Sequence, residues 1–215
     1  SALAWPQLRG TVGAPAAMQP GTGGADHGRL ALFIVAYGLA GFGYIVTATF
    51  LPVIARQLLP GSVWLDLFWP LFGLGVAVGA LLTLRVPARW NRLHLLAACY
   101  GMQATGILLG AWWPSLASLA VGSLLLGLPF TALTLFAVQE ARRLRPQDAS
   151  TLIGLLTASF GLGQIAGPPL VAALLAHSAT PAQGFALSLQ VAAGGLLAGL
   201  ALYGWLARGA PAPRA

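Results

Sequence analysis

Six long apolar stretches follow one another along this chain, and they constrain its fold more than any other feature. Each is about 21–28 residues long, which lets a helix rising ~1.5 Å per residue cross the ~30 Å hydrocarbon core of a bilayer. The stretches cover Leu30–Ala55, Val63–Leu84, Leu93–Trp113, Ser115–Gln139, Thr151–His177 and Gly184–Ala207. The sequence therefore predicts an all-α membrane protein with six transmembrane helices.

The basic residues are distributed unevenly over the gaps between these stretches. All eleven are arginine, and only Arg56 falls on one side of the expected membrane. The others lie in the termini and in alternate gaps: Arg9, Arg29, Arg85, Arg89, Arg92, Arg142, Arg143, Arg145, Arg208 and Arg214. Because arginine and lysine accumulate in cytoplasmic loops, we expect both termini and the loops 85–92 and 140–149 in the cytoplasm. The loops 56–62 and 178–183 would face outward.

Composition and charge argue against a soluble or nucleic-acid-binding protein. Hydrophobic residues make up 58% of the chain and charged residues 7%, far from the soluble range of roughly a quarter charged. The net charge of +7 is spread over short loops and does not gather on one face. The expected partners are therefore the lipid bilayer and a small-molecule substrate, with no nucleic acid.

The sequence also lacks the residues that common cofactors and intramembrane enzymes require. With no lysine there is neither a phosphate-binding loop nor a Schiff base. The single cysteine, Cys99, and three dispersed histidines do not make a metal site. A rhomboid-type protease needs a Gly-x-Ser-Gly nucleophile and an embedded histidine, which are absent. We expect no cofactor, no metal and no enzymatic activity.

Three segments are expected from composition. Residues 1–28 are rich in glycine and proline and read as a flexible cytoplasmic linker, 29–208 form the six-helix bundle, and 209–215 form a cytoplasmic tail. The chain starts with Ser1 and not with methionine. Together with the linker, this favours a chain cut from a longer one over methionine removal.

Two segments of eight residues repeat each other in helices that would cross the membrane in opposite directions. Residues 72–79 read FGLGVAVG and residues 160–167 read FGLGQIAG, identical at five positions. A weaker echo links Gly41, Phe50, Ala55 and Arg56 to the residues 86 positions later, Gly127, Phe136, Ala141 and Arg142. Repeats of inverted topology are typical of transporters, so we predict a 3+3 inverted repeat.

Small residues within the repeat are candidates for helix packing. Gly75 and Gly79, and likewise Gly163 and Gly167, stand four residues apart and therefore share one helix face. Such pairs let two backbones approach closely, and Pro168 follows the second pair. In a protein that alternates between two states, the same faces can also slide.

Polar and aromatic residues inside the spans are candidates for a binding site, because each polar group must face protein or water. The candidates that share helix faces are Tyr37, Tyr44, Thr131, Thr134, Thr157, Phe160 and Gln164, and Gln103 lies in the middle of the third stretch. We expect Tyr37, Tyr44, Thr131, Thr134, Phe160 and Gln164 to line a central cavity. A hydrogen bond between helices is the alternative explanation for each.

Two acidic residues have different expected roles. Asp66 is the one acid outside the cytoplasmic loops and the N-terminal tail, near Trp64 at interfacial depth. An interfacial polar role or proton coupling would explain it. Glu140 lies next to Arg142 at the cytoplasmic edge and is expected to pair with arginine there.

The segments Gly41-Phe-Gly-Tyr-Ile-Val-Thr-Ala-Thr-Phe-Leu-Pro-Val-Ile-Ala-Arg56 and Gly161-Leu-Gly-Gln-Ile-Ala-Gly-Pro-Pro169 resemble the major facilitator superfamily. Within it, residues 30–207 are similar to the carboxy-terminal half of the bacterial YbfB/YjiJ-type transporters. The resemblance implies half of a major facilitator fold in the bacterial cytoplasmic membrane, with an amino-terminal six-helix half as partner. It also implies that the first, second, fourth and fifth helices face that partner, while the third and sixth face lipid.

The chain departs from the superfamily pattern in two places. The loop motif G-x-x-x-D-R-x-G-R-R is present in outline, as Gly79, Arg85, Arg89 and Arg92, but without its Asp, so the gating salt bridge of that Asp does not carry over. The run Gly163-x-x-x-Gly167-Pro168 resembles an antiporter element but lies on the pseudo-symmetric helix, which favours export slightly.

We therefore expect the carboxy-terminal half of a secondary transporter that moves a small solute by alternating access, coupled to protons. A self-sufficient six-helix channel or homo-oligomer is the alternative. An exporter subunit that works with a separate ATPase chain also stays open.

Overall fold

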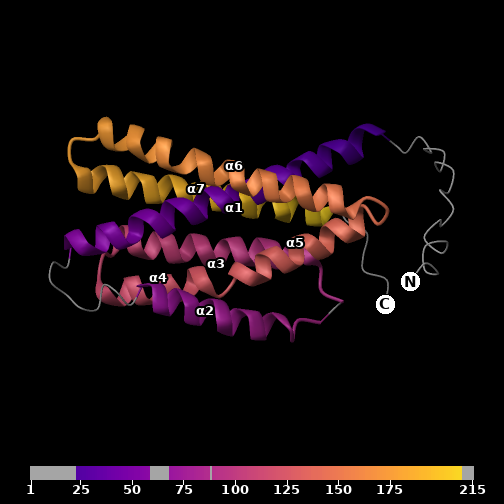
Figure 1. Cartoon of the computed structure of the whole chain (residues 1–215), viewed down its shortest axis with the longest axis horizontal. Coiled ribbons are helices and arrows are strands. Elements are labelled where there is room, and N and C mark those ends of the chain that lie inside the picture. The colour runs from indigo at the N-terminus through magenta and orange to yellow at the C-terminus, as the bar shows by residue number, and fades with distance from the viewer. Residues whose placement is uncertain (1–22, 59–67, 88, 210–215) are drawn as a thin grey trace, which may run out of the picture.

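The computed structural model describes residues 23–58, 68–87 and 89–209, and these fold into helices without a strand. The helices are α1 (Gly23–Leu58), α2 (Phe68–Thr83), α3 (Arg92–Trp112), α4 (Leu116–Gly127), α5 (Phe130–Leu144), α6 (Ala149–Ala176) and α7 (Pro181–Arg208) (Figure 1). Five segments are long and apolar enough to cross a membrane, and α2 is a shorter apolar helix of 16 residues. The prediction of an all-α membrane protein is confirmed.

The expected fourth helix, Ser115–Gln139, is not continuous. The helix ends at Gly127 and resumes at Phe130, so α4 and α5 form one broken span from Leu116 to Leu144. Pro129 has no N–H to donate and therefore interrupts the hydrogen-bond ladder, which resumes where the Leu133 N–H donates to the Pro129 carbonyl at 2.8 Å. By contrast, Pro168 and Pro169 lie inside an uninterrupted α6.

The other boundaries differ by smaller amounts. α1 begins at Gly23, so residues 23–28, expected within the linker, are helical. Residues 1–22, most of the expected linker, lie outside the described residues, as do 59–67 with Trp64 and Asp66. The last helix ends at Arg208, close to its expected end.

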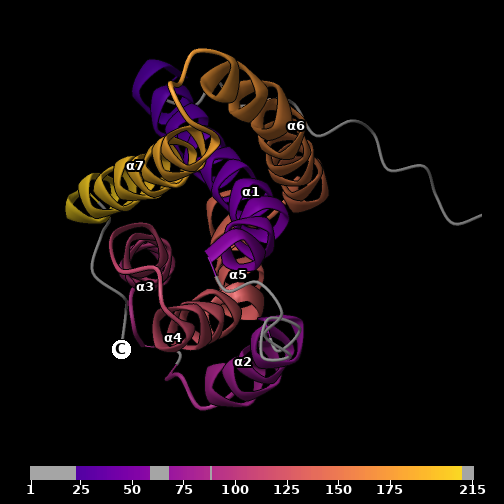
Figure 2. The same cartoon turned by 90° about the vertical axis from the view of Figure 1, so that its left-hand side faces the viewer.

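Seen along the bundle axis, the helices surround α1 and α5 (Figure 2). α2 and α6 lie on one side of this pair, and α3 and α7 lie on the other. The start of α1, the end of α7 and the α2–α3 and α5–α6 loops share one end of the bundle (Figure 1). Among the described arginines, Arg56 alone lies toward the opposite end, as the spacing of the arginines predicts.

Side-chain caps fix where three helices begin. The Asn91 side chain accepts a hydrogen bond from the Leu93 N–H at 2.9 Å before α3. Ser115 and Ser118 form a reciprocal capping box before α4, and Thr180 accepts from the Gln183 N–H before α7. These caps satisfy N–H groups that have no partner inside the helix. The short loops before α3, α4 and α7 thus follow directly from the sequence.

Two pairs of helices cross at backbone contact through glycines. A Cβ atom on Gly41 would overlap the Phe160 carbonyl oxygen, and one on Gly163 would overlap the Gly38 carbonyl oxygen, so α1 and α6 touch without side chains between them. In the same way, a Cβ on Gly127 would overlap the Phe72 carbonyl oxygen, where α4 meets α2. Close approach of this kind maximises van der Waals contact in a bilayer, which supplies no hydrophobic drive for helix association.

A third junction joins α1, α3 and α7 around two buried tyrosines. The rings of Tyr100 and Tyr203 lie edge to face with centroids 5.1 Å apart, and Phe33 packs on Tyr203 at 5.8 Å. The Tyr100 hydroxyl donates to the Ala36 carbonyl at 2.6 Å. This aromatic junction anchors the side of the bundle that faces away from α2 and α6.

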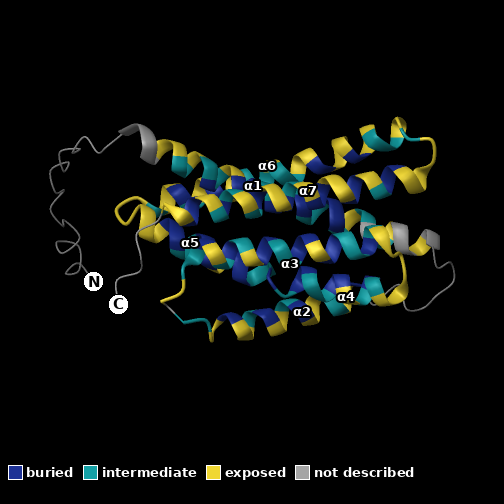
Figure 3. Cartoon of the chain, turned by 180° about the vertical axis from the view of Figure 1, so that it is seen from behind, coloured by how far each residue is buried: buried dark blue, intermediate teal, exposed yellow. Residues whose placement is uncertain are grey.

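α6 is the least covered of the candidate spans. Only 11% of the residues in its apolar window are buried, against 39–50% in the other four. Its buried residues, Leu152, Leu156, Gly167 and Val171, form a narrow seam. Large apolar side chains such as Leu162 and Ile165 on α6, and Leu74 and Leu81 on α2, are exposed (Figure 3).

The crossing of α1 and α6 gives a test with a matched control. Gly163→Ala should lower the free energy of unfolding by about 1–3 kcal/mol, because its methyl group meets the Gly38 backbone. Gly161→Ala, on the same helix with nothing within 4 Å, should leave stability unchanged or raise it by roughly 0.5–1 kcal/mol. The measurement is the unfolding midpoint of the purified protein in detergent. Equal effects of the two substitutions would contradict the close crossing.

Candidate functional site

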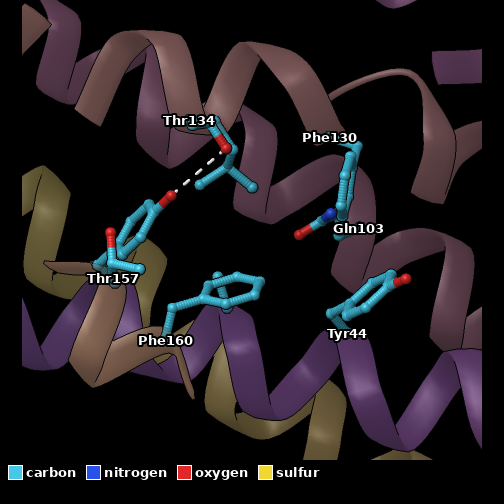
Figure 4. A pocket seen from close by; sticks show the side chains of 9 residues that line it. Tyr44, Gln103, Phe130, Thr134, Thr157 and Phe160 are labelled. Carbon is cyan, nitrogen blue, oxygen red and sulfur yellow. Dashed lines mark hydrogen bonds between the residues drawn. The ribbon is translucent and has the colours of Figure 1, made fainter. Parts of the chain in front are cut away.

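A cavity of about 210 Å³ lies where α1, α3, α5 and α6 meet (Figure 4). Its lining consists of aromatic, small polar and aliphatic side chains: Tyr37, Ala40, Tyr44, Gln103, Phe130, Leu133, Thr134, Thr157 and Phe160. Pockets of this kind, mostly apolar with a few polar groups, are typical of small-molecule sites.

Four of the six expected cavity residues line this cavity. Tyr37 and Tyr44 come from α1, Thr134 from α5 and Phe160 from α6. Thr131 and Gln164 are not among the lining residues. The Thr131 hydroxyl is buried without a hydrogen-bond partner, and Gln164 is half-buried on α6.

Aromatic rings contribute four of the nine lining residues. Tyr44 lies 5.1 Å from Phe130 and 6.4 Å from Phe160, measured between ring centroids. Tyr37 lies 5.5 Å from Phe160. Phe160 therefore connects the two tyrosines of α1, and all four rings border one space.

Three polar side chains complete the wall. The Tyr37 hydroxyl donates to Thr134 Oγ1 at 3.4 Å, a long hydrogen bond that crosses from α1 to α5. Thr157 donates to the Ile153 carbonyl of its own helix at 3.0 Å. Gln103, 4% exposed, donates from Nε2 to the Leu126 carbonyl at 3.5 Å, and its oxygen points into the cavity (Figure 4).

The break between α4 and α5 positions part of this site. Leu126 lies in the last turn of α4, so its carbonyl is close to the break and receives the Gln103 side chain from α3. Phe130 is the first residue of α5, directly after Pro129. Irregular backbone at membrane depth is found where it is buried in protein or lines a cavity, and here it borders one.

Helical periodicity would have revealed three lining residues that the sequence analysis did not select. Phe130 shares a helix face with Leu133 and Thr134, which follow it by three and four residues, and Ala40 lies between Tyr37 and Tyr44 on the same stripe of α1. The expected lining residues are polar side chains together with Phe160, which shares a helix face with Thr157 and Gln164. An apolar residue on a helix face that also carries polar candidates can be predicted to line the same cavity.

A wider groove of about 430 Å³ adjoins the cavity toward the end of the bundle opposite the start of α1 and the end of α7. Tyr44 belongs to both linings, and the groove continues along α1 through Thr49 and Pro52 to Arg56, with Trp69 of α2 beside it. The hydroxyl of Tyr44 points away from the cavity in Figure 4. The Tyr44 ring thus stands between the cavity and the groove.

At the other end of the bundle, charged groups pair with one another. Glu140, 1% exposed, accepts two hydrogen bonds from Arg143, at 2.9 Å from Nε and 2.6 Å from Nη2. The Arg92 Nε donates to Gln139 Oε1 at 2.7 Å and joins α3 to α5. The side chains of Arg85, Arg89 and Arg142 are exposed.

Two threonines on α5 give a direct test of the cavity. With the native thiol removed by Cys99→Ala, Thr134→Cys should react quickly with a maleimide, because Thr134 is exposed at the cavity. Thr131→Cys should react slowly, because the Thr131 hydroxyl is buried. Labelling rates of the two purified proteins, followed by mass, decide the question. Equal labelling rates would contradict the presence of a cavity at this face of α5.

Comparison with known proteins places the chain in a family. A search of curated proteins finds no match. Residues 1–203 match the family described as uncharacterised MFS-type transporter YbfB. The match spans most of the chain and agrees with the apolar helices of the structure. This chain therefore belongs to the YbfB-type family of major facilitator transporters.

Proposed function

We propose that this chain is the carboxy-terminal half of a secondary active transporter that moves a small solute across the bacterial cytoplasmic membrane by alternating access. The observation that carries the proposal is the cavity between α1, α3, α5 and α6. It lies beside the two glycine crossings, where helices touch through backbone alone. A solute site next to close helix crossings is what a rocking bundle requires.

The glycine crossings support a 3+3 inverted repeat. On α6, a Cβ at Gly163 would meet the Gly38 oxygen and the Phe42 nitrogen of α1. On α2, a Cβ at Gly75 would meet the Leu124 oxygen at 3.0 Å and the Leu128 nitrogen at 3.1 Å. Leu124 and Leu128 follow Gly38 and Phe42 by 86 positions, the offset of the sequence echo. The same backbone atoms thus meet in both halves of the bundle.

The second glycine of each crossing follows the same relation. Gly41 lies against the Phe160 carbonyl, and Gly127, 86 positions later, lies against the Phe72 carbonyl. Phe72 and Phe160 occupy the first position of the repeated octapeptide. The proposed repeat relates α1 to the broken span that begins with α4, α2 to α6, and α3 to α7. The packing of α1 on α6 then corresponds to that of α4 on α2, and the packing of α1 on α7 corresponds to that of α4 on α3.

The exposed side of the bundle suits a second six-helix bundle. α2 and α6 lie on the side away from α3 and α7 (Figure 2). The cavity is lined by residues of α1, α3, α5 and α6. Only 11% of the apolar window of α6 is buried, against 39% for α7, and α6 also borders the cavity, which is in line with a protein partner on this side. We infer that the amino-terminal half covers this side and closes the cavity, while α3 and α7 face lipid.

The orientation in the membrane is part of the proposal. Eight of the nine described arginines lie at the end of the bundle that holds the α2–α3 and α5–α6 loops. The positive-inside rule makes that end cytoplasmic. Both termini would then be in the cytoplasm.

Single cysteines in two exposed loops test this orientation. In the Cys99→Ala background, Ala179→Cys should react with a membrane-impermeant reagent in intact cells, and Gln147→Cys should react only after the cells are opened. Both side chains are exposed, so accessibility within the protein is matched. The readout is labelling of the purified protein on a gel. The reverse labelling pattern would indicate the opposite orientation in the membrane.

Transport itself is tested in vesicles that carry the natural gene product containing this chain. Vesicles loaded with a cell extract should release one or a few solutes, and the same solute added outside should accelerate that release. Such trans-stimulation is the mark of a carrier with alternating access, and a channel or a homo-oligomeric pore lacks it. The solutes are identified by mass spectrometry. Release that is protein-dependent but not accelerated would support the channel instead.

The control variant in the same vesicles is Gly163→Leu, which should abolish release, because the larger side chain cannot fit against the Gly38 backbone. Gly194→Leu, at an open position on α7, which would face lipid, should keep it. Collapsing the pH gradient tests coupling to protons, for which Asp66 is the proposed group. If the rate of release does not depend on the pH gradient, the carrier function stands and the coupling to protons is contradicted.

A further inference from the structure

We propose that the cavity takes an uncharged solute built on a single aromatic ring that carries a hydrogen-bond donor. The inference rests on the proposed function, since it names the class of solute for the same cavity. It follows from the charge, the shape and the free hydrogen-bonding capacity of the lining.

The lining offers no charge to a solute. Its nine residues are aromatic, aliphatic, hydroxyl or amide side chains. Glu140 is paired with Arg143 at the cytoplasmic end, and Arg56 borders the adjoining groove. An ion in the cavity would lose its hydration without a counter-charge in the wall.

The rings of the wall favour an aromatic occupant over a saturated one. Tyr37, Tyr44, Phe130 and Phe160 border one space, with centroid distances of 5.1–6.4 Å between neighbouring rings. These rings are tilted against each other by 30–45°. A flat ring among them makes offset or edge-to-face contacts, which gain more than burial of the same area alone.

Gln103 determines which hydrogen-bonding group the solute should carry. Its Nε2 faces the Leu126 carbonyl, an acceptor, so the amide nitrogen must be on that side. The amide oxygen is then directed into the cavity, as Figure 4 shows. An acceptor in an apolar cavity that lacks a partner is costly, so the solute should bring an N–H or O–H group to it.

The part of the site that this chain lines has room for one ring. An apolar cavity of about 150 Å³ holds a benzene molecule. The volume of about 210 Å³ therefore leaves room for one ring with a short polar substituent.

Four probes of nearly equal shape separate the possible solute classes. Benzamide is uncharged and aromatic, benzoate is its anionic counterpart, benzamidinium its cationic one, and cyclohexanecarboxamide is uncharged but saturated. Binding is measured by saturation-transfer NMR on nanodiscs that hold the natural gene product containing this chain, with empty nanodiscs as the blank. Benzamide should bind at least about tenfold more tightly than the other three.

Variants tie the binding to this cavity. Phe160→Ala and Gln103→Leu should each weaken benzamide binding about tenfold. Phe50→Ala is the matched control, because Phe50 packs on Phe185, outside the cavity lining. Gln103→Glu keeps the shape, and it should shift the preference from benzamide toward benzamidinium, which a merely structural role of Gln103 would not do. Gel filtration of each variant confirms that it is folded.

Tighter binding of benzamidinium would instead indicate an aromatic cage for organic cations, and tighter binding of benzoate an anion site. Either result overturns the proposal, as does equal binding of cyclohexanecarboxamide or binding that Phe160→Ala leaves unchanged. Benzamide binding without trans-stimulated release would support the proposed solute class and contradict the proposed carrier function. Trans-stimulated release of charged solutes alone would support the carrier function and contradict the proposed solute class.

Discussion

The close contact between α1 and α6 at Gly41 and Gly163 is the constraint on which the candidate site depends. Gly41 lies midway between Tyr37 and Tyr44 on α1, and it touches the backbone of Phe160 on α6. Any side chain at Gly41 would push Phe160 away from both tyrosines. The aromatic wall of the cavity is therefore a consequence of two backbones that meet without side chains between them. In a bilayer this contact has to come from shape, because lipid tails are as apolar as the helices.

The equivalent contact between α2 and α4 has a different consequence. Gly127 meets the Phe72 backbone, and the Leu128 carbonyl lies directly against Gly79. Immediately after this contact the helix breaks at Pro129, and α5 continues toward the end of the bundle that holds the α5–α6 loop. The first crossing thus builds the cavity wall with continuous helices, whereas the second lies at a break that presents Phe130 to the same cavity. Two similar contacts, related by the proposed repeat, serve different parts of one site.

Hydrogen bonding explains why Gln103 stands out among the polar residues of the spans. Most hydroxyls in the buried helices donate to the carbonyl four residues earlier on their own helix, as Thr47, Thr83, Ser123 and Ser188 do. They need no partner from another helix and no solute. An amide has both donors and acceptors, and it cannot satisfy them in this way. Gln103 uses its donor at the Leu126 carbonyl near the break and keeps its oxygen toward the cavity.

The amino-acid sequence by itself determined the helical membrane class, the positions of most spans and three of the glycines at the crossings, Gly75, Gly79 and Gly163, since each depends on local length, hydrophobicity or spacing. It also identified Tyr37, Tyr44, Thr134 and Phe160, because they lie on faces with a clear helical period. Only the tertiary structure decided that Thr131 and Gln164 lie outside the cavity lining while Ala40, Phe130 and Leu133 lie within it, since that depends on the angle at which each helix crosses its neighbours. The effect of proline was likewise decided by context: Pro129 ends a helix and Pro168 does not, although both lie in apolar stretches with glycine close before them. A proline removes one backbone donor wherever it stands, and the surrounding packing determines whether the helix continues past it.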